Sequence, residues 1–123
     1  IQIKGGIRVN IQLNSFTQEA ATKTKGLYLK EVLEKGLQAA EVITVDFSGI
    51  NRFASPFFNN SFAALALKYG FAKIEQIKLI HLSDVGKDAY DSSMDNAKML
   101  SSDPEFAAKV TQIIQEPPQK TEV

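Results

Sequence analysis

The side chains that could carry chemistry are concentrated in residues 46–61. This segment contains one carboxylate, one guanidinium, three amides and three hydroxyls. Such groups bind partners through hydrogen bonds, and a serine hydroxyl can also accept a phosphate. We take eight residues of the segment as candidates for partner binding or phosphorylation: Asp46, Ser48, Asn51, Arg52, Ser55, Phe57, Asn59 and Ser61.

Two interpretations of this segment remain open. In the structural one, Asp46 and Ser48 hydrogen-bond a turn and Ser55 caps the helix that follows. In the other, Ser55 is a switch: negative charge is favoured at a helix N-terminus, so the fold would tolerate a phosphate there, and Arg52 could help to hold it. Phe57 is then either exposed for docking or, as we favour, buried against the sheet.

The sequence offers little support for an enzyme. His81 is the only histidine, and alternation along a strand points it away from Ile80 and Leu82, towards a sheet edge or the surface. A hydrolytic site would need His81, Asp46 and Ser55 to converge at strand ends. The sequence has no nucleophile elbow, the sharp turn that presents the serine in many such enzymes, so the evidence for this site is poor. There is no cysteine and no glycine-rich phosphate loop. We therefore expect no catalytic residues, no metal and no cofactor.

Four aspartates could form a second kind of site. Asp84, Asp88, Asp91 and Asp95 share one face of a predicted helix. At 1.5 Å per residue they spread over roughly 16 Å, too far to hold a single ion. They predict a solvated acidic face or a patch that meets a basic partner.

Composition narrows the class of protein. Fourteen basic side chains balance fourteen acidic ones, so there is no overall field that would attract nucleic acid. No apolar run approaches the roughly 20 residues of a membrane span. We expect a cytoplasmic protein that neither binds nucleic acid nor inserts into a membrane. The start at Ile1 indicates a processed or excised chain rather than a signal peptide.

Apolar spacing predicts the elements that must position these groups. We expect strands within 1–13 (interrupted at Gly5-Gly6), 42–47 and 74–82, and helices within 15–41, 55–70, 83–100 and 102–116. Ser15 and Gln18 suggest a capping box before the first helix. The order predicts an α/β fold with a central mixed sheet of about four to five strands and helices packed on it. Residues 1–115 should form one domain, and 116–123 a disordered tail.

One stretch of sequence resembles a known family. Residues 42–69, which contain Asp46-Phe47-Ser48-Gly49 and an aromatic-rich helix that begins at Ser55, resemble the core of STAS domains, the fold of anti-sigma-factor antagonists. They are more similar still to a STAS-like family of unknown function with Asp-Phe-Ser-Gly at this place. In signalling STAS domains, Asp-Leu-Ser-Gly is followed four residues later by Asp-Ser-Ser-Gly, whose second serine usually accepts the phosphate. Here Ala54-Ser55-Pro56-Phe57 occupies that position, so Pro56 replaces the acceptor.

The resemblance implies a non-catalytic interaction module with a regulatory role in signalling. Its partner would be a protein, in many such systems a GHKL-type ATPase or a serine kinase, and the bound nucleotide would belong to that partner. Phosphorylation could persist only by moving to Ser55. The alternative is a structural subunit of a larger transport or defence complex that uses the acidic face. The sequence leaves the oligomeric state open.

Overall fold

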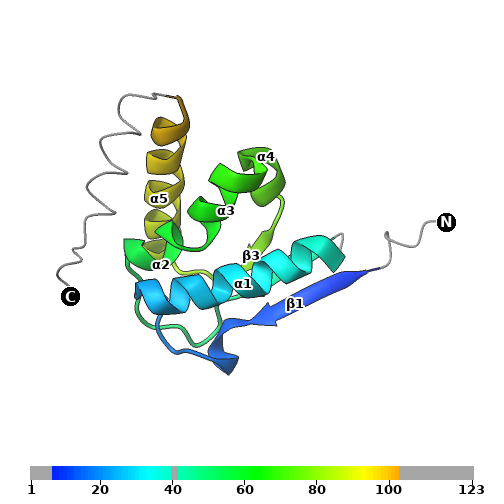
Figure 1. Ribbon diagram of the computed structural model, residues 1–123. Helices are drawn as coiled ribbons and strands as arrows, with labels where there is room; N and C mark the ends of the chain where they lie inside the picture. Colours follow the sequence, from blue (N-terminus) through cyan, green and yellow to red (C-terminus); the bar gives the residue numbers. More distant parts are fainter. Residues whose placement is uncertain (1–6, 40–41, 103–123) are drawn as a thin grey trace.

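The structure, a computed structural model, describes residues 7–39 and 42–102 (Figure 1). Its elements in chain order are β1 (Arg8–Gln12), the 3-10 turn η2 (Leu13–Ser15), α1 (Lys23–Ala39), β2 (Val42–Asp46), α2 (Ser55–Asn59), α3 (Phe62–Tyr69), α4 (Phe71–Ile74), β3 (Lys78–Ile80) and α5 (Asp84–Ser102). The Gly5-Gly6 interruption, the helix predicted over 102–116 beyond its first residue, the domain end at 115 and the tail lie outside the described residues.

The described sheet has three parallel strands in the order β1-β2-β3. The predicted α/β class is confirmed, whereas the mixed sheet of four to five strands is wrong for the part of the chain that the structure describes. Each connection between neighbouring strands contains helices, which return the chain to the end where the previous strand began. The strands therefore run the same way, and β2 lies in the centre.

Burial alternates along the strands and places the core on one face of the sheet. Ile11, Ile43 and Val45 are buried under the helices, as period-two alternation requires. The other face carries polar side chains and Ile80 around a shallow hollow of about 340 Å³. The sheet and its helices therefore form two layers in the described region.

The helix predicted over residues 55–70 is divided in the structure. α2 ends at Asn59 and α3 begins at Phe62. The side-chain amide of Asn60 donates to the carbonyl of Pro56 at 2.7 Å, and the Ser61 hydroxyl donates to that of Phe57 at 2.8 Å. Side chains that bind nearby carbonyls compete with the helical ladder, which accounts for the break.

The starts of two helices can be compared with the sequence predictions. α1 begins only at Lys23, so the predicted capping box at Ser15 is wrong; the cap is Thr22, whose hydroxyl accepts the Lys25 amide at 3.2 Å. Ser83 caps α5 by accepting the Gly86 amide at 3.2 Å.

The stretch before β3 is more helical than its apolar residues suggested. Gly70, with φ of 102°, ends α3 as expected, and α4 follows at once, so Ile74 is helical rather than part of a strand. Only residues 78–80 form β3. Ile74 and Ile77 are nevertheless buried, so their burial comes from packing of a helix and a turn rather than from a strand.

A cluster of aromatic side chains fills the space between β2, α2, α3 and α5. Phe58 lies at its centre, with ring centroids 6.2 Å from Phe47, 5.2 Å from Phe57, 6.1 Å from Phe62 and 5.9 Å from Tyr90. Burial raises the pKa of the Tyr90 hydroxyl to about 12, with smaller contributions from nearby carboxylates. The cluster fixes the helices that follow the β2 turn.

Candidate functional site

The turn after β2 brings together Asp46, Ser48 and His81. The Asp46 carboxylate accepts the Ser48 amide at 2.9 Å and the Ser48 hydroxyl at 2.7 Å through the same oxygen, Oδ1. Nδ1 of His81 lies 2.8 Å from that oxygen and 2.9 Å from the Ser48 hydroxyl. Asp46 pairs in register with Ile80, so His81 follows β3 directly beside the end of β2. The three side chains thus meet where two neighbouring parallel strands end.

The chemistry of the cluster follows from its ionised carboxylate. Hydrogen bonds from the Ser48 hydroxyl, from His81 and from the Ser48 amide, in that order, lower the pKa of Asp46 to about 2. An ionised carboxylate only accepts hydrogen bonds, so Nδ1 of His81 carries a hydrogen and Nε2 is left for solvent or a ligand. His81 has φ of 59°, a left-handed conformation that few residues adopt at low cost.

These bonds predict acid sensitivity. Folding lowers the pKa of Asp46 from 3.8 to about 2, so the carboxylate's stabilising contribution is complete above pH 3.8 and is lost as the pH falls towards 2. Asp46→Asn removes the titration, and its free energy of unfolding is expected to change less over that range than that of the wild type. Denaturant unfolding at a series of pH values measures the difference. Asp88→Asn, which removes an exposed carboxylate on α5, is the matched control and should retain the wild-type slope.

The cluster does not have the arrangement of a hydrolytic triad. In a triad the histidine lies between the acid and the serine and takes the serine proton. Here the Ser48 hydroxyl donates directly to Asp46, and His81 approaches both through a single nitrogen. Among the described residues, the hydrogen bonds of the cluster do not include Ser55, the serine that we considered for such a site. The geometry supports a rigid turn better than nucleophilic catalysis.

The loop between the turn and α2 is tied to the segment before α1. The Asn51 amide donates to the carbonyl of Gln18 at 3.2 Å, and the Ala20 and Ala54 amides donate to the carbonyls of Arg52 and Ala20 at 2.8 and 3.0 Å. Ala20 and Phe53 form a parallel bridge. The side chains of Phe47 and Ile50 are buried and anchor the same loop to the hydrophobic core. The loop is therefore held in one shape by its backbone and its core contacts.

Some candidate residues are exposed on this loop and others are not. Asn51, Arg52, Ser55 and Asn59 are exposed, whereas Asp46 and Ser48 are half-buried in the turn. Phe57 and Ser61 are fully buried, so neither can contact a partner in this conformation. The burial favoured for Phe57 is confirmed; the accessibility assumed for Ser61 is wrong, because its hydroxyl is used to end α2.

The expected role of Ser55 as a helix cap is also wrong. Ala54 occupies the cap position, and none of the described side chains caps α2. α2 has only five residues, and a helix that short carries a small dipole, so the electrostatic support expected for a phosphate on Ser55 is reduced. Arg52 lies 3.9 Å from Glu19. Both side chains are largely exposed, and such a pair contributes little to stability.

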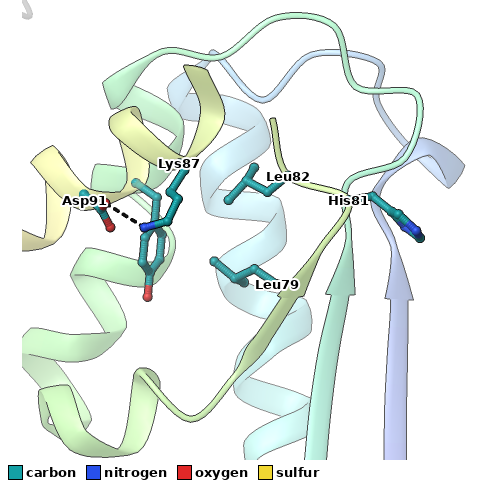
Figure 2. Close-up of a pocket in the computed structure, with 6 residues that line it drawn as sticks. Leu79, His81, Leu82, Lys87 and Asp91 are labelled. Atoms are coloured by element: carbon teal, nitrogen blue, oxygen red, sulfur yellow. Dashed lines mark hydrogen bonds and ion pairs between the residues drawn. The ribbon is translucent and has the colours of Figure 1, made fainter. Parts of the chain in front are cut away.

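The acidic face lies along α5, where Asp84, Asp88, Asp91 and Asp95 are all exposed. Lys87 pairs with Asp91 at 3.1 Å, which partly neutralises the face. Figure 2 shows this pair beside a hollow of about 310 Å³, towards which Leu79 and Leu82 point while His81 points away. Among the described residues, no group of three or more His, Asp or Glu is placed to hold a metal ion. Within residues 7–39 and 42–102, no helix is long and apolar enough to cross a membrane.

Sequence reasoning missed two contributors to the site. His81 was considered beside Asp46 only as part of a hydrolytic site with Ser55, so its contact with Ser48 was not predicted. The segment Gln18–Ala20, which holds the loop, gave no signal because it acts through backbone groups.

Comparison with protein families identifies a match. A family model described as a STAS-like domain of unknown function (DUF4325) matches residues 25–87, just over half of the chain. The matched range begins in the first turn of α1 and ends in that of α5, so it includes the whole Asp46, Ser48 and His81 cluster. Searches of curated proteins and of solved structures give no match.

Proposed function

Because the chain belongs to this STAS-like family of unknown function, we propose that it is a non-catalytic protein-interaction module. Its contact is the docking segment, which we define as the exposed residues Asn51, Arg52, Ser55 and Asn59. The observation that carries the proposal is the fixed shape of the loop before α2, whose backbone is bonded to Gln18 and Ala20. A loop already held in its binding shape loses little conformational entropy when a partner binds.

The chemistry of the docking segment indicates the kind of partner. It presents amides, a hydroxyl and one guanidinium, which suit a polar protein surface with hydrogen-bonding groups. STAS domains of signalling systems dock ATPases or serine kinases, and we propose a partner of that class in the cytoplasm. The nucleotide would be bound by the partner.

Ser55 is the proposed site of regulation. Its side chain is exposed at the start of α2, so a kinase can reach it. The weak pair between Arg52 and Glu19 leaves the guanidinium available to a phosphate. A phosphate there would add nearly two negative charges to the middle of the docking segment and so change its affinity for the partner.

A two-stage experiment tests the proposal. The tagged chain is recovered from its native lysate, and the intact mass of the chain and the identity of its partner are determined. The partner's affinity is then measured for Ser55→Asp and Ser55→Ala. We expect Ser55→Asp to change the dissociation constant by about tenfold, equivalent to making or breaking one charged hydrogen bond, and Ser55→Ala to change it much less.

Ser92→Asp is the matched control, since it places the same charge on an exposed serine of α5. It should leave the affinity unchanged. If both Ser55 variants bind like the wild type, Ser55 has no part in docking. The competing proposal, a structural subunit that uses the α5 acidic face, predicts instead an association that weakens with salt and with Asp88→Asn plus Asp91→Asn.

A further inference from the structure

An apolar groove between α2, α3 and α5 lies open at the surface of the described region. Its volume is about 600 Å³, larger than either of the other two hollows. The floor is formed by Ala63 and Ala97, which are almost fully buried, and the wall includes Leu67, whose exposed fraction is 47%. Small residues on the floor allow another backbone to approach closely, and an exposed leucine at the rim gains from being covered.

The two ends of the groove differ in character. Leu100 is in the last turns of α5 and Leu67 in the last turn of α3, and both helices end on the side away from α2 (Figure 1), so these two residues mark one end of the groove. The other end contains Asn59, Ser93 and Lys23, the last of which is the first residue of α1. The hydroxyl of Ser93 donates to the Asn59 side chain, so those two groups are already paired and Lys23 supplies the charge at that end.

The chain itself supplies an occupant of matching pattern. The sequence after Ser102 begins Asp103-Pro104, a typical helix start, and reaches Pro117-Pro118, which would stop a helix. Between them, four large apolar residues recur at helical spacing on one side: Phe106, Val110, Ile113 and Ile114.

Length and charge also agree. A helix over residues 105–116 would be about 18 Å long, which is enough to cover the stretch of α5 from Ser93 to Leu100, about 10 Å. A short connection after Ser102 makes two helices antiparallel neighbours. The returning helix would pass Leu100 first and bring Glu116 towards Lys23. Because the segment is attached at the end of α5, its effective concentration at the groove would be of millimolar order, above that of most separate partners.

We propose that residues 105–116 dock as an amphipathic helix in the groove between α2, α3 and α5. Phe106, Val110, Ile113 and Ile114 face the groove, and Gln112 faces solvent. The helix covers Leu67 and completes the core on the side of the molecule away from the sheet. The helix would cover Asn59 but not the other three residues of the docking segment, so the proposal does not depend on docking through Asn51, Arg52 and Ser55.

The absence of native cysteine makes a direct test possible in the full chain. Leu67→Cys combined with Phe106→Cys should form an intramolecular disulfide on mild oxidation, detected as a loss of about 2 Da in the intact monomer as two thiol hydrogens leave. The matched pair, Leu67→Cys with Ala108→Cys, places the second thiol on the opposite side of the helix and should cross-link much more slowly. A disulfide-linked dimer from the first pair would overturn the proposal in favour of a second copy of the chain.

A second measurement does not depend on disulfide geometry. Ala64→Cys places a thiol on the groove lining, and Ala72→Cys places one on exposed α4 as the control. Ile113→Asp should accelerate alkylation at position 64 by about tenfold, as expected if the groove is otherwise covered about nine-tenths of the time, and leave position 72 unchanged. Gln112→Asp should alter neither. Equal alkylation of both thiols in the otherwise native chain would show an open groove and contradict the proposal.

Discussion

Replacing Phe58 with alanine is expected to lower the free energy of unfolding by about 3–5 kcal/mol, the usual cost of removing a fully buried phenylalanine. Phe58 has no exposed surface, and its ring contacts four other aromatic rings, from β2 to α5. Deleting it leaves a cavity among rigid rings, which close around empty space less readily than flexible aliphatic side chains do.

Denaturant unfolding followed by circular dichroism measures this loss through the midpoint at constant slope. Val85→Ala is the control: Val85 is mostly exposed on α5, and the loss there should be below about 1 kcal/mol because little buried area is removed. A loss below about 1 kcal/mol for Phe58→Ala would contradict the central place given to this ring.

Gly26→Ala is expected to destabilise the fold by about 3 kcal/mol or more. A Cβ atom at Gly26 would lie 2.5 Å from the carbonyl oxygen of Phe57 and 3.1 Å from its carbonyl carbon. These are backbone atoms of α2, so the clash can be relieved only by moving α1 away from α2. That movement would also disturb the docking segment, because two of its residues, Ser55 and Asn59, belong to α2.

Gly36→Ala is the matched control within the same helix. There a Cβ atom would lie 3.3 Å from Cδ1 of Ile43, the far end of a flexible side chain. Alanine also favours the helix by about 1 kcal/mol relative to glycine, so the net change should stay within about 1 kcal/mol of zero by thermal or denaturant unfolding. Equal losses for the two variants would show that contact between α1 and α2 is not what requires Gly26.

The fold could be predicted from sequence where apolar spacing alone decides the element. The buried run from Val42 and the stripe through Met94 and Ala97 were identified correctly as strand and helix, because burial of one face imposes its period on the sequence. The break at Asn60 and Ser61 could not be predicted in this way. The break depends on side chains that donate hydrogen bonds to backbone carbonyls of the helix. The spacing of apolar residues carries no information about these bonds.

The candidate site was predictable only in part for a similar reason. The Asp46 and Ser48 turn is local and was expected from residue types alone. The contact with His81 depends on β3 pairing with β2 so that Asp46 faces Ile80, which is a property of the sheet order. Convergence of Asp46 and His81 was considered only for a hydrolytic site, because residue types alone do not show which strands are neighbours.

The parallel sheet has a consequence for how the chain reaches its native state. Each strand of the described sheet pairs only with strands that lie a whole strand–helix unit away along the chain. Forming such a pairing first costs the conformational entropy of closing a long loop, and only then gains stabilising contacts. Since no two neighbouring strands are joined by a short turn, this sheet cannot be nucleated by a β-hairpin. The local contacts within α1 and α5 can form early. β2, which needs neighbours on both sides, should acquire its full set of hydrogen bonds only in the last, cooperative step.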